Sequence, residues 1–124
     1  MDDRARRAFA EVIGEGEQTA LLLDSRGEVT AGVYLDADGR DVSSEIGVAL
    51  ADVGSEARRA MRHLSLGSWC AIVFECEEAN LAIAPVDGDE IVLVAASPEV
   101  PVGFVRRLLD RAVRRALSWR REVA

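Results

Sequence analysis

The spacing of hydrophobic residues divides the chain into helical and extended segments. Apolar residues recur at helical spacing in three segments, residues 3–13, 42–64 and 102–121. Shorter apolar runs bounded by turn residues predict strands at 18–24, 29–35, 69–76, 79–86 and 91–96. Gly14 and Gly16 are expected to end the first helix. The predicted order of elements is therefore α-β-β-α-β-β-β-α.

The links between the predicted strands are short, which favours a mainly antiparallel sheet of five strands. Residues 29–35 alternate between apolar and polar, as is typical of a half-exposed edge strand. Residues 18–24, 69–76 and 91–96 are apolar on both faces, so helices must cover both sides of the sheet. We expect an α+β fold in one domain, residues 1–124, with one helix on one face and two on the other.

Two neighbouring rows of residues run along the long predicted helix. The first row has heptad-like spacing and consists of Ile46, Leu50, Val53, Ala57, Ala60 and Leu64. The second row is small: Gly47, Ala51 and Gly54. Each helical glycine costs about 1 kcal/mol relative to alanine, so a packing reason is expected. We interpret the small row as a face for a second helix, and Asp41 or Ser43 as the N-cap.

Composition and charge limit the classes of function. The chain has 124 residues, of which 49% are hydrophobic, enough for a substantial core. It lacks an apolar run of membrane-spanning length and an apolar N-terminal signal segment, so a cytoplasmic protein is expected. The net charge of −7 argues against general nucleic-acid binding. Residues 101–124 are nevertheless basic, and their arginines form a solvated face, a dock for an acidic protein or a contact to anionic lipid.

The two cysteines, Cys70 and Cys76, lie in one apolar run. Six residues along a strand span roughly 20 Å, too far for a disulfide within the chain. Neither cysteine belongs to a metal-binding motif. We interpret both as small buried hydrophobes, with an intermolecular bridge near a symmetry axis as the alternative.

Catalytic and cofactor motifs are weak throughout the sequence. The only histidine, His63, is interpreted as a residue complementing the C-terminal dipole of the long helix. The glycine-containing segment 14–19 cannot be a nucleotide-binding P-loop, because the chain has no lysine. Asp36, Asp38 and Asp41 resemble a sparse calcium loop, but a turn followed by a helix cap explains them better. We therefore expect a protein without enzymatic chemistry, metal or cofactor of its own.

The ordered set of elements resembles a known family. The segment ALLLDSRGEVTAG, residues 20–32, resembles the opening hairpin of roadblock / dynein light-chain domains. Residues 41–64 are similar to their long central helix, and AIVFECEEANLAIAPV to their third and fourth strands. GDEIVLVAASPEVPVGFVRR is similar to their last strand and final helix, although Pro101-Val-Gly103 stands where Asn-Leu-Gly is usual.

The resemblance implies a roadblock/profilin-like fold, with the long helix on one face and the first and last helices on the other. It also implies a homodimer joined through the third strands and long helices. The interface residues expected on this basis are Gly47, Ala51, Gly54, Trp69, Ala71 and Val73.

Roadblock domains are regulators and scaffolds, and in bacteria they often accompany small Ras-like GTPases. The resemblance therefore implies a homodimeric GTPase regulator that modulates nucleotide state or localisation. The residues expected to contact the GTPase are Ser55, Arg58, Arg59 and Arg62, and one of the arginines is a candidate arginine finger. The alternative is an adaptor or scaffold subunit of a motor, polarity or membrane-associated complex, docked through the basic last helix. A small-molecule sensor is a third interpretation, but the sequence indicates no polar pocket.

Overall fold

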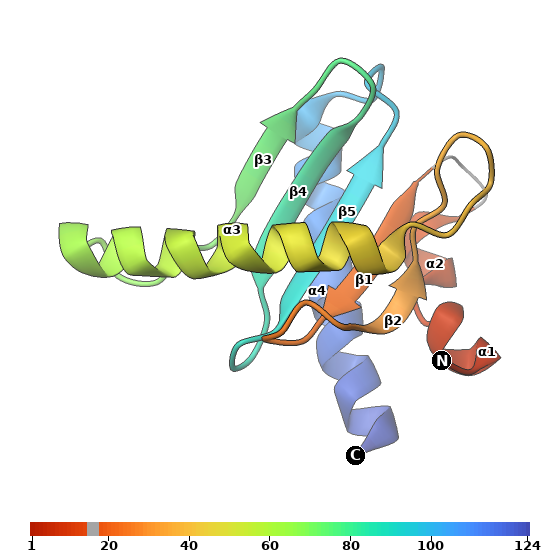
Figure 1. The fold of residues 1–124 in the computed structure, drawn as a ribbon, viewed down its shortest axis with the longest axis horizontal. Helices are drawn as coiled ribbons and strands as arrows, with labels where there is room; N and C mark the ends of the chain where they lie inside the picture. Colours follow the sequence, from red (N-terminus) through yellow and green to blue (C-terminus); the bar gives the residue numbers. More distant parts are fainter. Residues whose placement is uncertain (15–17) are drawn as a thin grey trace.

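The computed structural model describes residues 1–14 and 18–124 (Figure 1). Its helices are α1 (Asp3–Arg6), α2 (Ala10–Ile13), α3 (Ser43–Leu64) and α4 (Val102–Val123). Its strands are β1 (Thr19–Leu23), β2 (Val29–Val33), β3 (Ile72–Glu75), β4 (Asn80–Pro85) and β5 (Ile91–Ala96). The predicted order is confirmed, except that the first helix is divided into two short helices. Gly14 ends α2 with a φ of 64°, whereas Gly16 lies outside the described residues.

The five strands form one sheet in the order β2-β1-β5-β4-β3, and each neighbouring pair is antiparallel. The alternating strand β2 lies at one edge of this sheet, as its pattern predicts. At the other edge lies β3, which is shorter than the predicted strand 69–76. The central strand β5 is buried along its whole length.

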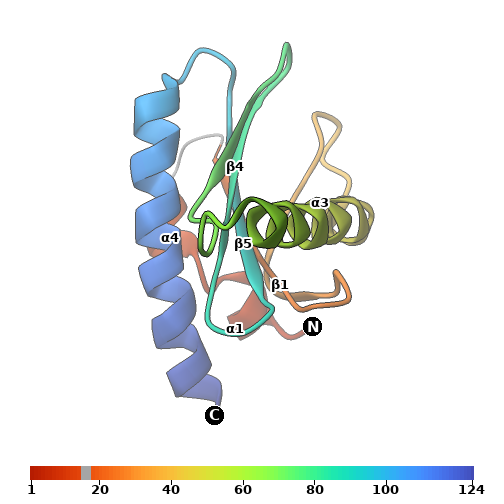
Figure 2. The same cartoon turned by 90° about the vertical axis from the view of Figure 1, so that its left-hand side faces the viewer.

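Helices cover both faces of the sheet (Figure 2). Leu21, Leu23 and Leu93 point toward α3 and pack in one core cluster. Leu22 and Val94, on the opposite side of the same strands, pack with α4 and the N-terminal helices in a second cluster. The two clusters arise because successive strand side chains point to opposite faces. The predicted fold class, with α3 on one face and the first and last helices on the other, is confirmed.

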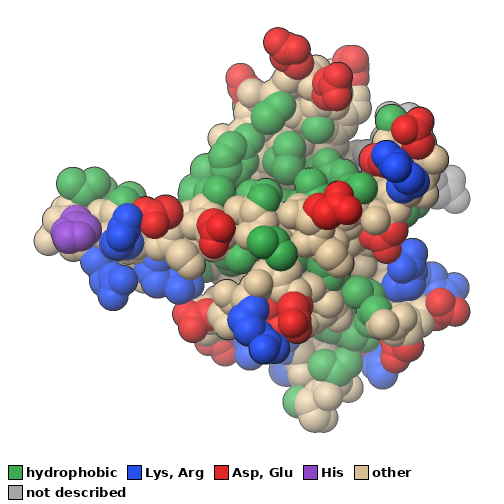
Figure 3. Space-filling view, viewed as in Figure 1, with side chains coloured by type: hydrophobic (Ala, Val, Ile, Leu, Met, Phe, Trp, Pro, Cys, Tyr) green, Lys and Arg blue, Asp and Glu red, His purple; other side chains and the backbone are tan. Residues whose placement is uncertain are grey.

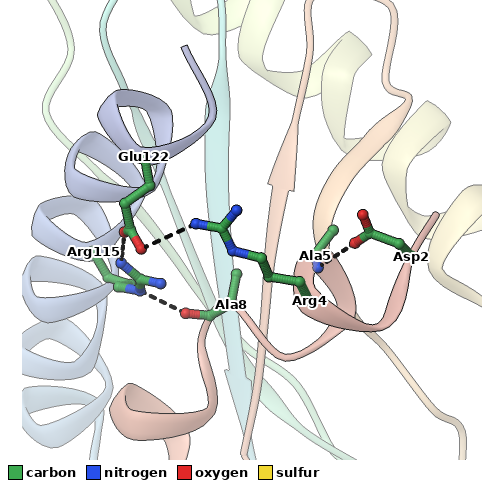
Figure 4. A network of polar contacts seen from close by, with 6 residues as sticks. All are labelled: Asp2, Arg4, Ala5, Ala8, Arg115 and Glu122. Atoms are coloured by element: carbon green, nitrogen blue, oxygen red, sulfur yellow. Dashed lines mark hydrogen bonds and ion pairs between the residues drawn. The ribbon is translucent and has the colours of Figure 1, made fainter.

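Arginines attach the N-terminal helices to α4 (Figure 4). The Arg115 side chain donates a hydrogen bond of 2.6 Å to the carbonyl oxygen of Ala8 and forms an ion pair with Glu122. Arg4 lies 3.7 Å from the same carboxylate. Both guanidinium groups lie over the ring of Trp119, at 5.2 Å for Arg4 and 5.8 Å for Arg115. The hydrogen bond from Arg115 lowers the pKa of Glu122 below its usual value.

A candidate protein-interaction surface on α3 and β3

A hydrogen-bond network fixes the start of α3 on the sheet. The Asp41 carboxylate accepts hydrogen bonds from the Ser43 N–H at 3.0 Å and from the Ser43 hydroxyl at 2.5 Å. The Ser43 hydroxyl oxygen in turn accepts one from the Tyr34 N–H at 2.7 Å. The two bonds from Ser43, and Arg6 at 3.3 Å, lower the pKa of Asp41, with the Ser43 hydroxyl the largest cause. The N-cap position itself is Val42, so the expectation of Asp41 or Ser43 as N-cap was wrong by one residue.

The small row of α3 packs on the sheet of its own chain. Gly47, Ala51 and Gly54 are all buried. A Cβ atom on Gly47 would lie 2.3 Å from the carbonyl oxygen of Gly27, and one on Gly54 would lie 2.2 Å from Cδ1 of Ile91. The interpretation of this row as a face for a second helix is therefore wrong. The small row instead lets α3 lie close to the β1–β2 turn and to β5.

The C-terminal half of α3 projects past the β3 edge of the sheet (Figure 1). We call residues 57–66 the overhang. The heptad-like row is half-buried where it crosses the sheet, but Leu64 and Leu66 on the overhang are 62% and 65% exposed. Met61 is half-buried between them and the core. The overhang thus carries apolar side chains for which the chain's own sheet provides no complete cover.

A second apolar area lies on the sheet face beside α3. Figure 3 shows hydrophobic side chains gathered there, between the helix and the acidic tips of the strands. Ile72, Phe74 and Leu81 belong to the core cluster on this face but remain half-exposed. A groove of about 390 Å³ lies on the same side, lined among others by Tyr34 and Ile46. We call this area the open face.

The edge strand β3 also has unpaired peptide groups. The Cys76 N–H donates to the Ala79 carbonyl oxygen at 3.0 Å, which closes the β3–β4 hairpin. Peptide groups alternate in direction along an antiparallel pair, so within β3 those of Val73 and Glu75 point away from β4. Such an edge is a template for another strand. The Val73 side chain is 39% exposed.

The other predicted interface residues on this segment lie further inside. Ala71 is half-buried. Trp69 is only 7% exposed, because its ring packs in the core cluster beneath α3, near Gly54. The Trp69 ring is therefore not exposed on the protomer for the expected contact with a second subunit.

A basic cleft of about 600 Å³ separates the overhang from the β4–β5 turn. Arg58 and Arg62 line it from α3. Arg58 is held by an ion pair with Asp89 at 3.0 Å. Arg62 is exposed and makes no ion pair within 4.0 Å across residues 1–14 and 18–124. Of the predicted contact arginines, Arg62 is therefore the one that the described chain leaves available for an external acidic group.

The remaining predicted contact residues adjoin this pair of arginines along α3. Arg59 is exposed and forms an ion pair with Glu56 at 2.6 Å. Ser55 is exposed and shares a smaller groove with Arg58. Arg59 lines a further hollow with Arg62. The structure thus groups Arg58 with Arg62 in the cleft and places Ser55 and Arg59 beside them, without one pocket that holds all four residues. Sequence reasoning missed Met61 and Leu66, although both are apolar residues next to the predicted helix end.

The polar clusters in the loops have structural explanations. Asp24 accepts hydrogen bonds from the N–H groups of Arg26 and Glu28, which makes the opening hairpin a turn. Asp36 does the same for Asp38 and Arg40. Within the described ranges, no group of three or more His, Cys, Asp and Glu residues is suited to hold a metal ion. None of the helices described is long and apolar enough to cross a membrane.

The two cysteines differ from expectation, whereas the last helix keeps a solvated basic face. Cys70 and Cys76 are free and exposed, so the interpretation of both as buried hydrophobes was wrong. On α4, Arg106, Arg115 and Arg120 form ion pairs with carboxylates of the chain itself. The other four arginines of this helix, Arg107, Arg111, Arg114 and Arg121, are exposed, so most of the basic face is solvated.

Comparison with solved structures identifies the fold. A roadblock/LC7 domain from Streptomyces avermitilis superposes with a TM-score of 0.75 at 17% identity, covering 92% of this chain and 95% of that one. The gliding protein MglB from Thermus thermophilus gives 0.71 at 20% identity, covering 95% and 94%. A structure of MglB with a tetrameric arrangement gives 0.72 at 20% identity, covering 95% and 93%. No family model and no curated protein matches the sequence. The chain has the roadblock fold.

Proposed function

We propose that this roadblock-fold chain is a non-enzymatic, homodimeric regulator of a small Ras-like GTPase. It binds the GTPase in the cytoplasm and modulates its nucleotide state or its localisation. The overhang of α3 is the observation that carries the proposal, because a helix with exposed Leu64 and Leu66 beyond its own sheet calls for a protein partner.

A second copy of the chain fits the apolar surfaces. A two-fold axis normal to the sheet at β3 would carry the overhang of each protomer onto the open face of the other (Figures 1 and 3). The same rotation would pair the two β3 edges and join the sheets. One interface would thus cover the overhang, the open face and the free strand edge, as closed two-fold contacts do. Self-association is also supported by the fold's likeness to MglB, which is known in a tetrameric arrangement.

The GTPase is proposed from the family resemblance together with the basic cleft. Roadblock proteins of bacteria often accompany small Ras-like GTPases. Arg62, unpaired within the described chain, and the neighbouring Arg58 provide cationic groups at the end of α3. A regulator must bind one nucleotide state of its GTPase more tightly than the other, since equal affinities shift nothing. Contact through Arg62 would serve this purpose if the acidic surface it meets belongs to a switch region.

The scaffold alternative has less support. It assigns docking to the basic face of α4, yet Arg106, Arg115 and Arg120 of that helix already bind the chain's own carboxylates. Their charge is therefore partly neutralised before any partner arrives.

Binding to the GTPase encoded nearest the gene, loaded with GDP or with a non-hydrolysable GTP analogue, tests the proposal. We expect at least a tenfold difference in Kd between the two forms, and weaker binding for Arg62→Ala. Arg114→Ala is the matched control, because Arg114 is an exposed arginine on the opposite layer of the molecule. Equal Kd values for both nucleotide forms, with unchanged hydrolysis and localisation of the GTPase, would contradict the proposed regulatory function.

A further inference from the structure

We infer that Cys70 of one protomer and Cys76 of its partner face each other across a β3–β3 junction and are a site of reciprocal intersubunit disulfides. The inference rests on the proposed homodimer and adds the register of its strands. Both thiols are exposed on the protomer and flank the edge strand: Cys76 directly follows β3, and Cys70 lies two residues before it. Within one chain they cannot meet, because six extended residues span roughly 20 Å.

Symmetry restricts the registers that two β3 strands can adopt. A two-fold axis normal to the sheet leaves every side chain on the face where it started. Two directly opposed residues must also point to the same face. Because side chains alternate along a strand, a residue of one protomer can oppose only those residues of the partner whose numbers differ from its own by an even number. The axis therefore passes through a residue such as Val73, which then opposes its own copy.

The peptide groups of the free edge select among these registers. Within β3, Val73 and Glu75 are the residues whose N–H and C=O groups point away from β4, and Ala71 joins them where a partner strand extends the pairing by one residue. With the axis at Val73, this residue pairs with the partner's Val73, and Ala71 pairs with the partner's Glu75. All the outward groups of this segment then find partners. A shift by two residues would instead oppose Glu75 to the partner's Trp69, or Ala71 to the partner's Glu77 in the hairpin turn.

The register centred on Val73 places Cys70 directly opposite the partner's Cys76, twice by symmetry. Cys76 directs its N–H toward Ala79 of its own hairpin, so this cysteine pair is not hydrogen-bonded across the junction. Cα atoms of non-hydrogen-bonded antiparallel pairs lie about 4.5 Å apart. That separation falls within the range of about 4.4 to 6.8 Å that disulfides require. The pair therefore meets the distance requirement once the strand pairing extends from Ile72 back to Cys70.

Charge favours the same arrangement. In this register the partner's Glu77 and Glu78 extend beside Trp69 and Ser68, which line the cleft that contains Arg58 and Arg62. The acidic hairpin tip of each protomer thus approaches the basic overhang of the other. Opposite charges placed across an interface in this way stabilise one register relative to others.

The chemistry requires an external oxidant, and a hydroperoxide is sufficient. One cysteine thiolate attacks the peroxide, the O–O bond breaks, and a sulfenic acid and an alkoxide or hydroxide ion form. The opposed thiol then attacks the sulfenic sulfur, the S–S bond forms and water leaves. Each disulfide thus transfers two electrons to one hydroperoxide. A reducing thiol reverses the bond by exchange.

Complementation between two single-cysteine variants tests the register. Full-length chain treated with hydrogen peroxide should run as a covalent dimer, twice 13.4 kDa, on a non-reducing gel. Cys70→Ser and Cys76→Ser should each lose the covalent dimer, because neither retains an opposed pair. When the two variants are mixed and allowed to exchange subunits before oxidation, the covalent dimer should return.

Three outcomes would overturn the inference. A single variant that crosslinks to itself would show Cys70 opposite Cys70, or Cys76 opposite Cys76. A mixture that sediments as a dimer in reductant yet fails to crosslink would refute the register while leaving the proposed homodimer intact. A wild-type chain that is monomeric in reductant and does not crosslink would contradict both the register and the dimer.

Discussion

At the scale of single residues, two glycines determine how closely α3 lies on the sheet. The neighbour of Gly47 is the carbonyl oxygen of Gly27, a turn residue with a φ of 84°. The neighbour of Gly54 is Cδ1 of Ile91, the far end of a flexible side chain. A rigid backbone and a flexible side chain resist an added methyl group very differently.

Substitution by alanine should therefore separate the two glycines. Gly47→Ala should lower the free energy of unfolding by about 1–2 kcal/mol, because overpacking against backbone outweighs the gain in helix propensity. Gly54→Ala should remain within about 1 kcal/mol of wild type, since Ile91 can adopt another rotamer and the helix gains propensity. Urea denaturation of both variants measures the difference. Equal effects at the two positions would contradict the packing described for α3.

The anchor of α3 at Asp41 predicts a dependence on pH. Hydrogen bonds from Ser43 lower the folded-state pKa of Asp41 below its ordinary value of 3.8. Its stabilising contribution is therefore complete well above pH 3.8 and is lost as the pH falls through the lower, folded-state pKa. Asp41→Asn should be less stable than wild type at neutral pH, and the difference should shrink in acid. Urea denaturation as a function of pH measures the difference in stability between Asp41→Asn and wild type. Asp38→Asn is the control for loss of a surface carboxylate. A stability difference that stays constant with pH would contradict the role given to Asp41.

At the scale of elements, the periods of the sequence predict most of the fold. Residues 42–64 and 91–96 were recognised because their helical and continuous apolar patterns are long and uninterrupted. The break between α1 and α2 was missed, because no glycine or proline marks it. The orientation of α3 was also missed. Its two rows are adjacent on the helix, and only the short distances to Gly27 and Ile91 show that the small row packs on the sheet together with the heptad-like row.

The attachment of α4 to the N-terminal helices depends on Arg115. Arg115→Ala should lower the free energy of unfolding by about 1–2 kcal/mol, because the Ala8 carbonyl oxygen and the Trp119 ring both lose this cation. The exposed Arg114 on the same helix is the matched control, and Arg114→Ala should stay within about 0.5 kcal/mol of wild type. Thermal or urea unfolding compares them. If both variants behave alike, the polar clamp does not stabilise this layer.

At the scale of the whole molecule, the decisive feature is the relation between α3 and the edge of the sheet. The residue pattern predicts a long helix at 42–64, five strands and an edge position for residues 29–35, but not the remaining strand order, the crossing direction or the overhang. For the same reason Cys70 and Cys76 were expected to be buried, since a continuous apolar run does not reveal that its strand lies at an edge. Strand β3 combines apolar residues with a free edge, and a second protomer would explain that combination.

Sedimentation of the wild-type chain and of Val73→Pro in reductant tests the homodimer most directly. The Val73 N–H points away from β4, so proline removes a donor from the edge without breaking the hairpin. The control Val73→Thr keeps the N–H and should resemble wild type. We expect wild type and Val73→Thr to sediment at twice 13.4 kDa at micromolar concentration, and Val73→Pro at 13.4 kDa with an unchanged circular dichroism spectrum. A wild-type chain that sediments at 13.4 kDa, or a Val73→Pro dimer as stable as wild type, would contradict a homodimer joined through β3.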